Sequence, residues 1–164
     1  MSLATETDVQ ELAEMTAMQL EQEKNMDFSD AIQQCKDKWS KDQRVETLFP
    51  LACLLIKSQN RKDLVQGIRL LQDIRVQPKT DSQMRFDCGY CIATGQFKLA
   101  EYGQAGDTVQ ELLAVQPDNK QVLALQQLIQ NKLQQDGRLG LGIAAGVFAG
   151  AVLLGAVLMK GGKK

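Results

Sequence analysis

The sequence predicts an all-α fold, a helical bundle of about six helices, and three observations support this prediction. Apolar residues recur at helical spacing, and no run alternates with a period of two. Helix-breaking residues at 60–61, 78–79, 98–99 and 117–118 divide the chain after residue 45 into pieces of 14–18 residues. The joints between these pieces are so short that consecutive helices must be antiparallel neighbours.

The first two predicted helices each carry one apolar face. The first helix lies in an acidic arm over residues 1–26, and its face consists of Val9, Leu12, Ala13, Thr16 and Leu20. Asp27 and Phe28 begin the second helix, whose face consists of Phe28, Ala31, Ile32, Cys35 and Trp39. Residues at these spacings share one side of a helix, so both helices need a surface to cover.

Five further helical segments follow, over residues 45–59, 63–76, 81–97, 99–115 and 118–135. The first of them contains Pro50. Proline has no backbone N–H and is tolerated in the first turn of a helix. We therefore expect this helix to begin near Phe49, with Pro50 in its first turn.

Residues 49–78 and 87–117 can be aligned as two helix–turn–helix units. Leu55 and Ala93 take equivalent positions, and twelve residues later Gly67 and Ala105 leave room for two helices to pack closely. A proline ends or nearly ends each unit. Both units resemble the tetratricopeptide repeat, and the second fits its spacing better. The residues predicted to pack the repeats are Leu55, Gly67, Ala93, Ala105 and Pro117.

The C-terminal part contains 21 consecutive residues, Leu139 to Met159, without a charge. A helix of this length spans about 32 Å, which matches a hydrocarbon core of about 30 Å. A buried helix of a soluble domain would need a larger protein around it. The sequence therefore predicts a transmembrane tail anchor over 138–160 and a short basic tail over 161–164.

The residues that flank this span are basic, and only five residues follow it. This arrangement implies insertion after translation, with the rest of the chain facing the cytosol. A short, moderately hydrophobic span with basic flanks favours the mitochondrial outer membrane first and peroxisomes second. The targeting residues are Arg138, Lys160, Lys163 and Lys164.

Three glycines of the predicted anchor, Gly142, Gly146 and Gly150, recur every four residues. Such a strip lets two membrane helices approach closely, so two chains could pair as a homo-oligomer. The alternative is that these glycines only moderate the hydrophobicity of the span. The sequence does not separate the two interpretations.

Charge and composition exclude several classes of function. Residues 1–137 carry 20 acids and 15 bases, which argues against a nucleic-acid surface. The chain has no histidine, which removes most zinc sites and the usual nucleophile–base pairs. No paired carboxylates or phosphate loop appears. We therefore predict a protein that is not an enzyme and needs no metal or cofactor.

Two cysteines, Cys88 and Cys91, are separated by two residues. This spacing fits half of a zinc site or a redox pair, but Cys35 and Cys53 are isolated and no strand precedes the pair. The simplest interpretation is that Cys88 and Cys91 are small apolar residues on one face of a helix. Regulatory oxidation is the main alternative.

Helical-repeat domains bind partners through a concave surface formed by the first helix of each unit. The usual repeat pattern places Phe49, Ala52, Ile56, Gln59, Asp87, Tyr90, Thr94, Phe97 and Lys98 on this surface. Core packing explains the aromatic residues and Ile56 equally well. Plain solvent exposure explains Gln59, Asp87 and Lys98.

Over about residues 28–164 the chain resembles the mitochondrial fission 1 protein family. The resemblance rests on the order of elements and on the stretches FPLACLLIKS, GIRLLQDI, ATGQFKLAEYGQA and PDNKQVLALQQLIQNKLQQDGRLGLGIAAGVFAGA. It implies a tetratricopeptide-like cytosolic domain over 27–137 on the mitochondrial outer membrane. It also implies recruitment or regulation of a dynamin-related GTPase, directly or through an adaptor. The acidic arm over 1–26 is longer than the resemblance leads us to expect.

The apolar face of the arm suggests a removable cover for the groove, since the groove is the nearest surface. Two other classes remain open. A tail-anchored apoptosis regulator would need a central apolar helix, which is missing. A co-chaperone that binds acidic peptides would need several basic groove residues, and this groove offers only Lys98 and Asn60.

Overall fold

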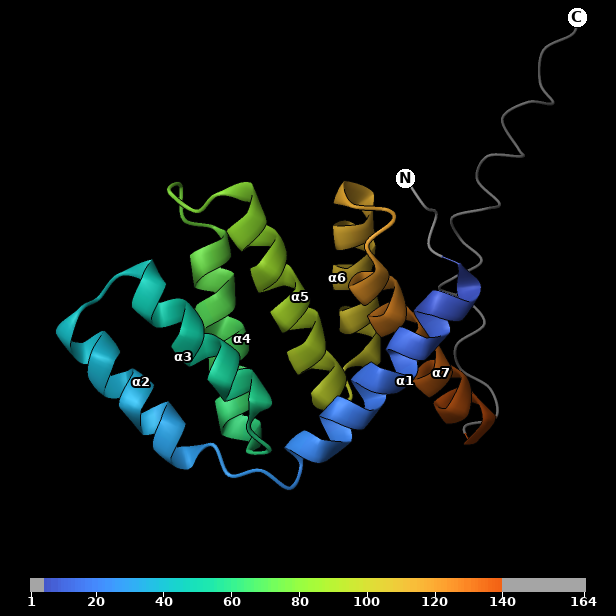
Figure 1. Ribbon diagram of the computed structural model, residues 1–164, viewed down its shortest axis with the longest axis horizontal. Coiled ribbons are helices and arrows are strands. Elements are labelled where there is room, and N and C mark those ends of the chain that lie inside the picture. Colours follow the sequence, from blue (N-terminus) through green and yellow to red (C-terminus); the bar gives the residue numbers. More distant parts are fainter. Residues whose placement is uncertain (1–4, 140–164) are drawn as a thin grey trace, which may run out of the picture. The chain divides into compact units, whose positions relative to one another are not determined.

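The computed structural model describes residues 5–139, which form seven α-helices and no strand (Figure 1). The chain divides into two compact units, Met1–Gln130 and Asn131–Lys164, and all contacts discussed below lie within the first. The helices are α1 (Glu6–Glu23), α2 (Ser29–Lys41), α3 (Val45–Lys57), α4 (Arg61–Arg75), α5 (Ser82–Lys98), α6 (Tyr102–Val115) and α7 (Lys120–Leu139). The predicted all-α fold is confirmed.

The helices from α2 to α6 pack against one another in chain order (Figure 1). Thus α3 and α4 form one helix–turn–helix unit, and α5 and α6 form the next. Helix α3 also contacts α5, so the first helices of the two units lie side by side. This contact creates a continuous surface from α3 to α5.

Two apolar clusters hold the units together. The larger joins α3, α4 and α5 and includes Ile56, Leu71, Ile74, Cys88 and Ile92. The smaller joins α2 to α3 through Ile32, Leu51 and Leu55, with Trp39 packed against them. Leu55, Leu71 and Ile74 are fully buried. Burial of side chains of this size stabilises a fold by about 1.5–3 kcal/mol each.

Small residues mark the closest helix–helix approaches. A Cβ atom added at Gly67 in α4 would lie 3.0 Å from the Ala52 carbonyl oxygen and 3.0 Å from the Leu55 Cβ, both in α3. Ala93 and Ala105, in the second unit, have no exposed surface. Pro117 is exposed, just beyond the C-cap residue of α6. The close approach at Gly67 allows α3 and α4 to pack backbone against backbone.

The turn between α5 and α6 has a left-handed residue, Ala100, with φ 60°. The Glu101 N–H donates to the Gln96 carbonyl at 2.9 Å, and the Ala100 N–H donates to the Phe97 carbonyl at 3.0 Å. This pair of bonds defines a Schellman end, at which glycine is usual. Helix α6 therefore begins at Tyr102 rather than at the predicted residue 99.

The predicted start of α3 near Phe49 is wrong, because α3 begins at Val45 and Pro50 lies inside the helix. The first turn is closed ahead of Pro50 by the Leu48 N–H, which donates to the Arg44 carbonyl at 3.1 Å. Pro50 removes one backbone donor, but α3 is flanked by both apolar clusters. Tertiary packing thus outweighs the local preference of proline.

No helix between residues 5 and 139 is long and apolar enough to cross a membrane. The predicted anchor lies outside the described residues from position 140 onward. The predicted pairing glycines Gly142, Gly146 and Gly150 and the targeting residues Lys160, Lys163 and Lys164 fall in the same undescribed part. Arg138 belongs to the last turn of α7.

Candidate partner-binding groove

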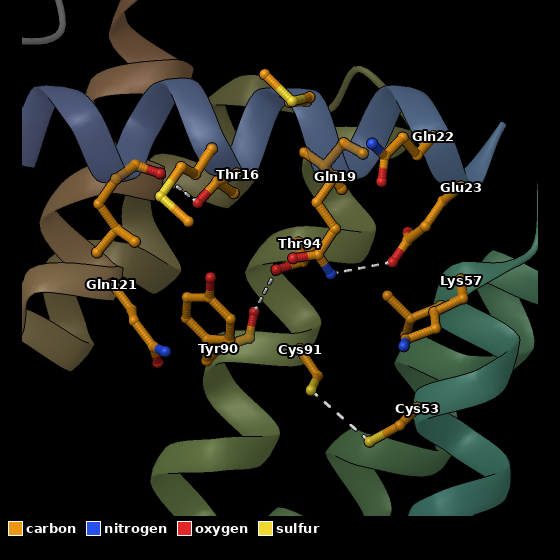
Figure 2. A pocket seen from close by; sticks show the side chains of 15 residues that line it. Thr16, Gln19, Gln22, Glu23, Cys53, Lys57, Tyr90, Cys91, Thr94 and Gln121 are labelled. Atoms are coloured by element: carbon orange, nitrogen blue, oxygen red, sulfur yellow. Dashed lines mark hydrogen bonds between the residues drawn. The ribbon is translucent and has the colours of Figure 1, made fainter.

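Helix α1 covers the surface formed by α3 and α5 and leaves a cavity of about 510 Å³ beneath it (Figure 2). Most lining residues come from three helices. They are Leu12, Met15, Thr16, Met18, Gln19, Leu20, Gln22 and Glu23 from α1, Cys53, Ile56 and Lys57 from α3, and Tyr90, Cys91 and Thr94 from α5, together with Gln121. The groove is thus partly covered by the chain itself, but it remains open to solvent and is not filled.

The lower side of α1 is the apolar face that the sequence predicts. Ala13 is buried, and Val9, Leu12, Thr16 and Leu20 are half-buried. The Thr16 hydroxyl donates to the Leu12 carbonyl at 2.7 Å, so its polar atom is satisfied within the helix. Met15 and Met18 keep 65% and 62% of their surface exposed, so the edge of α1 remains loosely packed.

A buried ion pair joins the end of α1 to the end of α5. Glu23 Oε2 lies 3.3 Å from Lys98 Nζ, and the two side chains are only 9% and 8% exposed. Lys98 also donates to the Lys57 carbonyl at 2.8 Å, and the Gln19 side-chain amide donates to Glu23 Oε1 at 3.3 Å (Figure 2). Burial lowers the pKa of Lys98, and the carboxylate of Glu23 opposes this change. Each charge therefore depends on the other.

A second ion pair holds the other end of α1. Asp8 Oδ2 lies 2.9 Å from Lys120 Nζ, and both side chains are nearly half exposed. The hydrogen bond from Lys120 holds the pKa of Asp8 below its usual value. Solvent screens exposed pairs of this kind, so they contribute little to stability. The Glu23–Lys98 pair is therefore the more important polar contact of α1.

The floor of the groove contains two thiols in contact. Cys53 Sγ lies 3.7 Å from Cys91 Sγ, across the interface between α3 and α5 (Figure 2). Cys88 is fully buried in the larger apolar cluster. Cys91 packs against the same cluster, which agrees with the prediction that Cys88 and Cys91 are small apolar residues on one side of a helix. The predicted isolation of Cys53 is wrong, because its sulfur contacts that of Cys91. Neighbouring helices decide which sulfur atoms meet. Among residues 5–139 no three His, Cys, Asp or Glu side chains are placed to hold a metal ion.

The residues predicted for the groove divide into those that lie at the cavity and those that lie elsewhere. Ile56, Tyr90 and Thr94 line the cavity, and Lys98 binds Glu23. Burial raises the pKa of Tyr90, and the Thr94 hydroxyl donates to the Tyr90 carbonyl at 3.0 Å. These four residues come from both repeat units.

The other predicted groove residues lie elsewhere. Ala52 is fully buried against α4, so its side chain is not accessible to a partner. Phe49 packs against the larger apolar cluster, and the Phe97 ring lies 5.4 Å from that of Tyr102. Asp87 accepts a hydrogen bond from the Gln83 amide at 2.8 Å. Gln59 is exposed beside a second, smaller hollow of about 280 Å³.

Sequence reasoning missed several groove residues, notably Glu23, Cys53, Lys57 and Cys91. A signal for Glu23 existed, because it continues the apolar face of α1 three residues after Leu20. A charged residue on such a face needs a buried partner of opposite charge. The α3 residues on the floor are Cys53, Ile56 and Lys57, of which the sequence pattern predicted Ile56 alone.

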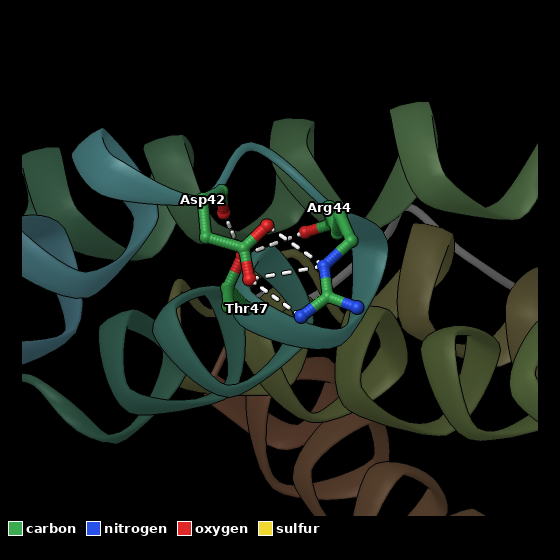
Figure 3. A network of polar contacts seen from close by, with 3 residues as sticks. All are labelled: Asp42, Arg44 and Thr47. Atoms are coloured by element: carbon green, nitrogen blue, oxygen red, sulfur yellow. Dashed lines mark hydrogen bonds and ion pairs between the residues drawn. The ribbon is translucent and has the colours of Figure 1, made fainter.

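A separate polar network lies outside the groove, in the turn from α2 to α3 (Figure 3). Arg44 donates through Nε to Asp42 Oδ1 at 2.7 Å and through Nη2 to Asp42 Oδ2 at 2.6 Å. The Thr47 hydroxyl contacts the backbone carbonyls of Asp42 and Arg44. These contacts fix the start of α3. None of the three residues lines the groove.

Two helix–turn–helix units with a groove along their first helices define a protein of the tetratricopeptide-repeat class. The family model described as the Fis1 C-terminal tetratricopeptide repeat matches residues 86–138. The chain is 39% identical over 121 residues to the mitochondrial fission 1 protein of Gibberella zeae, which covers 73% of this chain and 76% of that protein. It is 41% identical over 115 residues to the mitochondrial fission 1 protein of Yarrowia lipolytica, which covers 70% of this chain and 73% of that protein. The chain belongs to the mitochondrial fission 1 protein family.

Solved structures agree with this assignment. The crystal structure of fission protein Fis1 from Saccharomyces cerevisiae superposes with a TM-score of 0.64 and 27% identity, covering 73% of this chain and 94% of that one. Yeast Fis1 in complex with an Mdv1 fragment superposes with a TM-score of 0.63 and 26% identity, covering 71% of this chain and 93% of the Fis1 chain. That fragment contains an N-terminal extension and a coiled-coil domain.

Proposed function

We propose that this chain is an adaptor that recruits the fission machinery to the mitochondrial outer membrane through the groove between α3 and α5. Membership in the mitochondrial fission 1 protein family and the Mdv1 complex of yeast Fis1 support this proposal. The expected partner is an adaptor of the Mdv1 type, which would connect the chain to a dynamin-related GTPase. Peroxisomes are the second membrane on which it would act.

The observation that carries this proposal is the unfilled cavity beneath α1. Protein interiors are normally packed without voids larger than a water molecule, so a loosely packed surface gains contacts when a better-fitting helix occupies it. Only Ala13 and Glu23 of α1 are buried. Helix α1 therefore acts as a removable cover that competes with the partner.

The co-chaperone alternative needs free cations in the groove. Lys98 is paired with Glu23 and with the Lys57 carbonyl, which leaves it poorly placed to bind an acidic peptide. Of the described residues, Lys57 is the one cationic residue that lines the cavity, whereas a carboxylate clamp needs several. Membership in the mitochondrial fission 1 protein family argues against the apoptosis-regulator alternative. The fission adaptor is the function that the groove supports best.

The direct test compares the full chain with a chain that lacks residues 1–26. The affinity of each for an Mdv1-type fragment with an N-terminal extension and a coiled coil is measured by titration calorimetry. Removal of a competing helix should raise the affinity about tenfold, which corresponds to about 1.4 kcal/mol. Unchanged or weaker binding would show that α1 does not act as a cover. Absence of binding by both chains would contradict the adaptor function itself.

The anchor is tested in cells with the tagged full chain and a version that ends at Asp136. We expect the full chain on the mitochondrial surface with altered mitochondrial length, and we expect the truncated chain to lose both effects. Localisation to the endoplasmic reticulum would contradict the proposed compartment. Protease protection would report the orientation, with the tagged N-terminal domain digested on intact mitochondria.

A further inference from the structure

The two thiols on the groove floor have a geometry close to that of a disulfide. Cys53 comes from α3 and Cys91 from α5, and their Sγ atoms are 3.7 Å apart. A disulfide has an S–S distance of about 2.05 Å, so the sulfur atoms must approach by about 1.6 Å. Rotation of the two side chains and a small shift of the helices would supply this distance. Both side chains are only partly buried, which leaves room for the movement.

The surroundings of the pair favour reaction. The hydrogen bond between the two sulfurs lowers the pKa of Cys91 and raises that of Cys53, so Cys91 is the thiol that ionises more readily. Both residues line the cavity beneath α1, which is large enough to admit a small oxidant. Cys88, by contrast, is fully buried, and burial raises its pKa to about 11.

We infer that Cys53 and Cys91 form a reversible disulfide that links the first helices of the two repeat units across the floor of the groove. The oxidant class is a hydroperoxide, and the reductant class is a low-molecular-weight thiol. This inference does not depend on the identity of the groove's partner. It concerns the covalent state of the groove floor alone.

The reaction balances in two steps. The Cys91 thiolate attacks one oxygen of hydrogen peroxide, an S–O bond forms, the O–O bond breaks, and hydroxide leaves and takes up a proton to give water. The Cys53 sulfur then attacks the Cys91 sulfenic acid, an S–S bond forms, the S–O bond breaks, and a second water leaves with the Cys53 proton. Two thiols lose two electrons and one peroxide becomes two waters. Two molecules of a low-molecular-weight thiol reverse the change and become one disulfide.

The disulfide would close a loop between residues that are 38 positions apart in sequence. A crosslink of this span restricts the unfolded chain and stabilises the folded one. The expected increase in melting temperature is roughly 5–10 °C. The bond also fixes the separation of α3 and α5, so the oxidised groove cannot widen.

Peptide mapping of the full chain in detergent, treated with hydrogen peroxide and then alkylated, tests the inference. Trypsin separates residues 45–57, which contain Cys53, from residues 86–98, which contain Cys88 and Cys91. We expect these two peptides to be joined by a disulfide. Alkylation is carried out on the denatured protein, and fragmentation in the mass spectrometer should then locate the alkyl group on Cys88. Dithiothreitol should separate the peptides and reverse the increase in melting temperature.

Three variants complete the test. Cys53→Ala and Cys91→Ala should each abolish the joined peptide and the thermal shift, whereas Cys35→Ala, the matched control on α2, should keep both. A mass loss confined to peptide 86–98 would show a Cys88–Cys91 bond and overturn the inference. Covalent dimers through Cys35, or sulfinic acid at Cys91 without a crosslink, would overturn it as well. Far-ultraviolet circular dichroism verifies that each variant is folded.

Discussion

At the scale of single residues, the Glu23–Lys98 pair shows how a polar contact controls a loosely packed helix. The pair is buried at the point where α1 ends, and it joins residues 75 positions apart in sequence. Removal of one partner of a buried pair leaves the other charge without compensation, which is unfavourable by about 3–5 kcal/mol in a rigid site. Here α1 can detach instead, so the loss is limited to the free energy that holds α1 in place.

We therefore expect Glu23→Gln to release α1 without unfolding the rest of the domain. Hydrogen exchange measured by mass spectrometry should show at least tenfold faster exchange over residues 6–23, with α4 unchanged. Glu21→Gln is the matched control, because Glu21 is exposed and pairs only with its neighbour Lys24. Equal exchange in the two variants would contradict a specific role for Glu23.

A second residue-scale prediction concerns Ala100, whose left-handed conformation is unfavourable for a residue with a Cβ. Ala100→Gly should stabilise the domain by about 1 kcal/mol, measured by urea denaturation. Ala114→Gly, at an exposed site inside α6, should destabilise it by about 1 kcal/mol. Changes of the same sign in both variants would contradict the explanation based on Ala100.

At the scale of elements, the two repeat units depend on small residues where helices approach closely. Gly67 in α4 faces the backbone of α3, where an added Cβ would contact the Ala52 carbonyl oxygen at 3.0 Å. Gly103 in α6 has no atom within 4 Å of the corresponding position. The same substitution should therefore have opposite effects at the two sites.

We expect Gly67→Ala to lower the free energy of unfolding by about 1–2 kcal/mol, because overpacking outweighs the gain in helix propensity. Gly103→Ala should raise it by about 0.5–1 kcal/mol. Chemical denaturation of both variants measures these changes. A stabilising effect at Gly67 would show that α3 and α4 can separate without loss.

At the scale of the whole molecule, helices α2 to α6 and the first part of α7 contribute the buried core, including Val122 and Leu125 of α7, and α1 controls access to the groove. The large buried side chains Leu55, Leu71 and Ile74 lie in α3 and α4, whereas α1 contributes only Ala13 and Glu23 to the buried set. A protein with this division of roles can lose α1 and keep its fold. The groove between α3 and α5 then becomes accessible.

Deletion of residues 1–26 should accordingly lower the melting temperature by only a few degrees and leave one cooperative transition. Leu55→Ala should be far more damaging, with a loss of about 2–5 kcal/mol. Calorimetry of the two proteins tests the comparison. If the deletion is as destabilising as Leu55→Ala, α1 is part of the core and not a cover.

The sequence by itself determined the all-α class, the apolar face of α1 and the repeat units, because these follow from the spacing of residues along one helix. The tertiary structure alone decided which side chains meet between helices. It placed Cys53 against Cys91, turned Phe97 toward Tyr102, and paired Glu23 with Lys98. It also kept Pro50 inside α3. Such contacts depend on how each helix is rotated about its axis and on the distance between packed helices. A periodic pattern gives the buried face of a helix, but it does not give the residue that this face meets on the next helix.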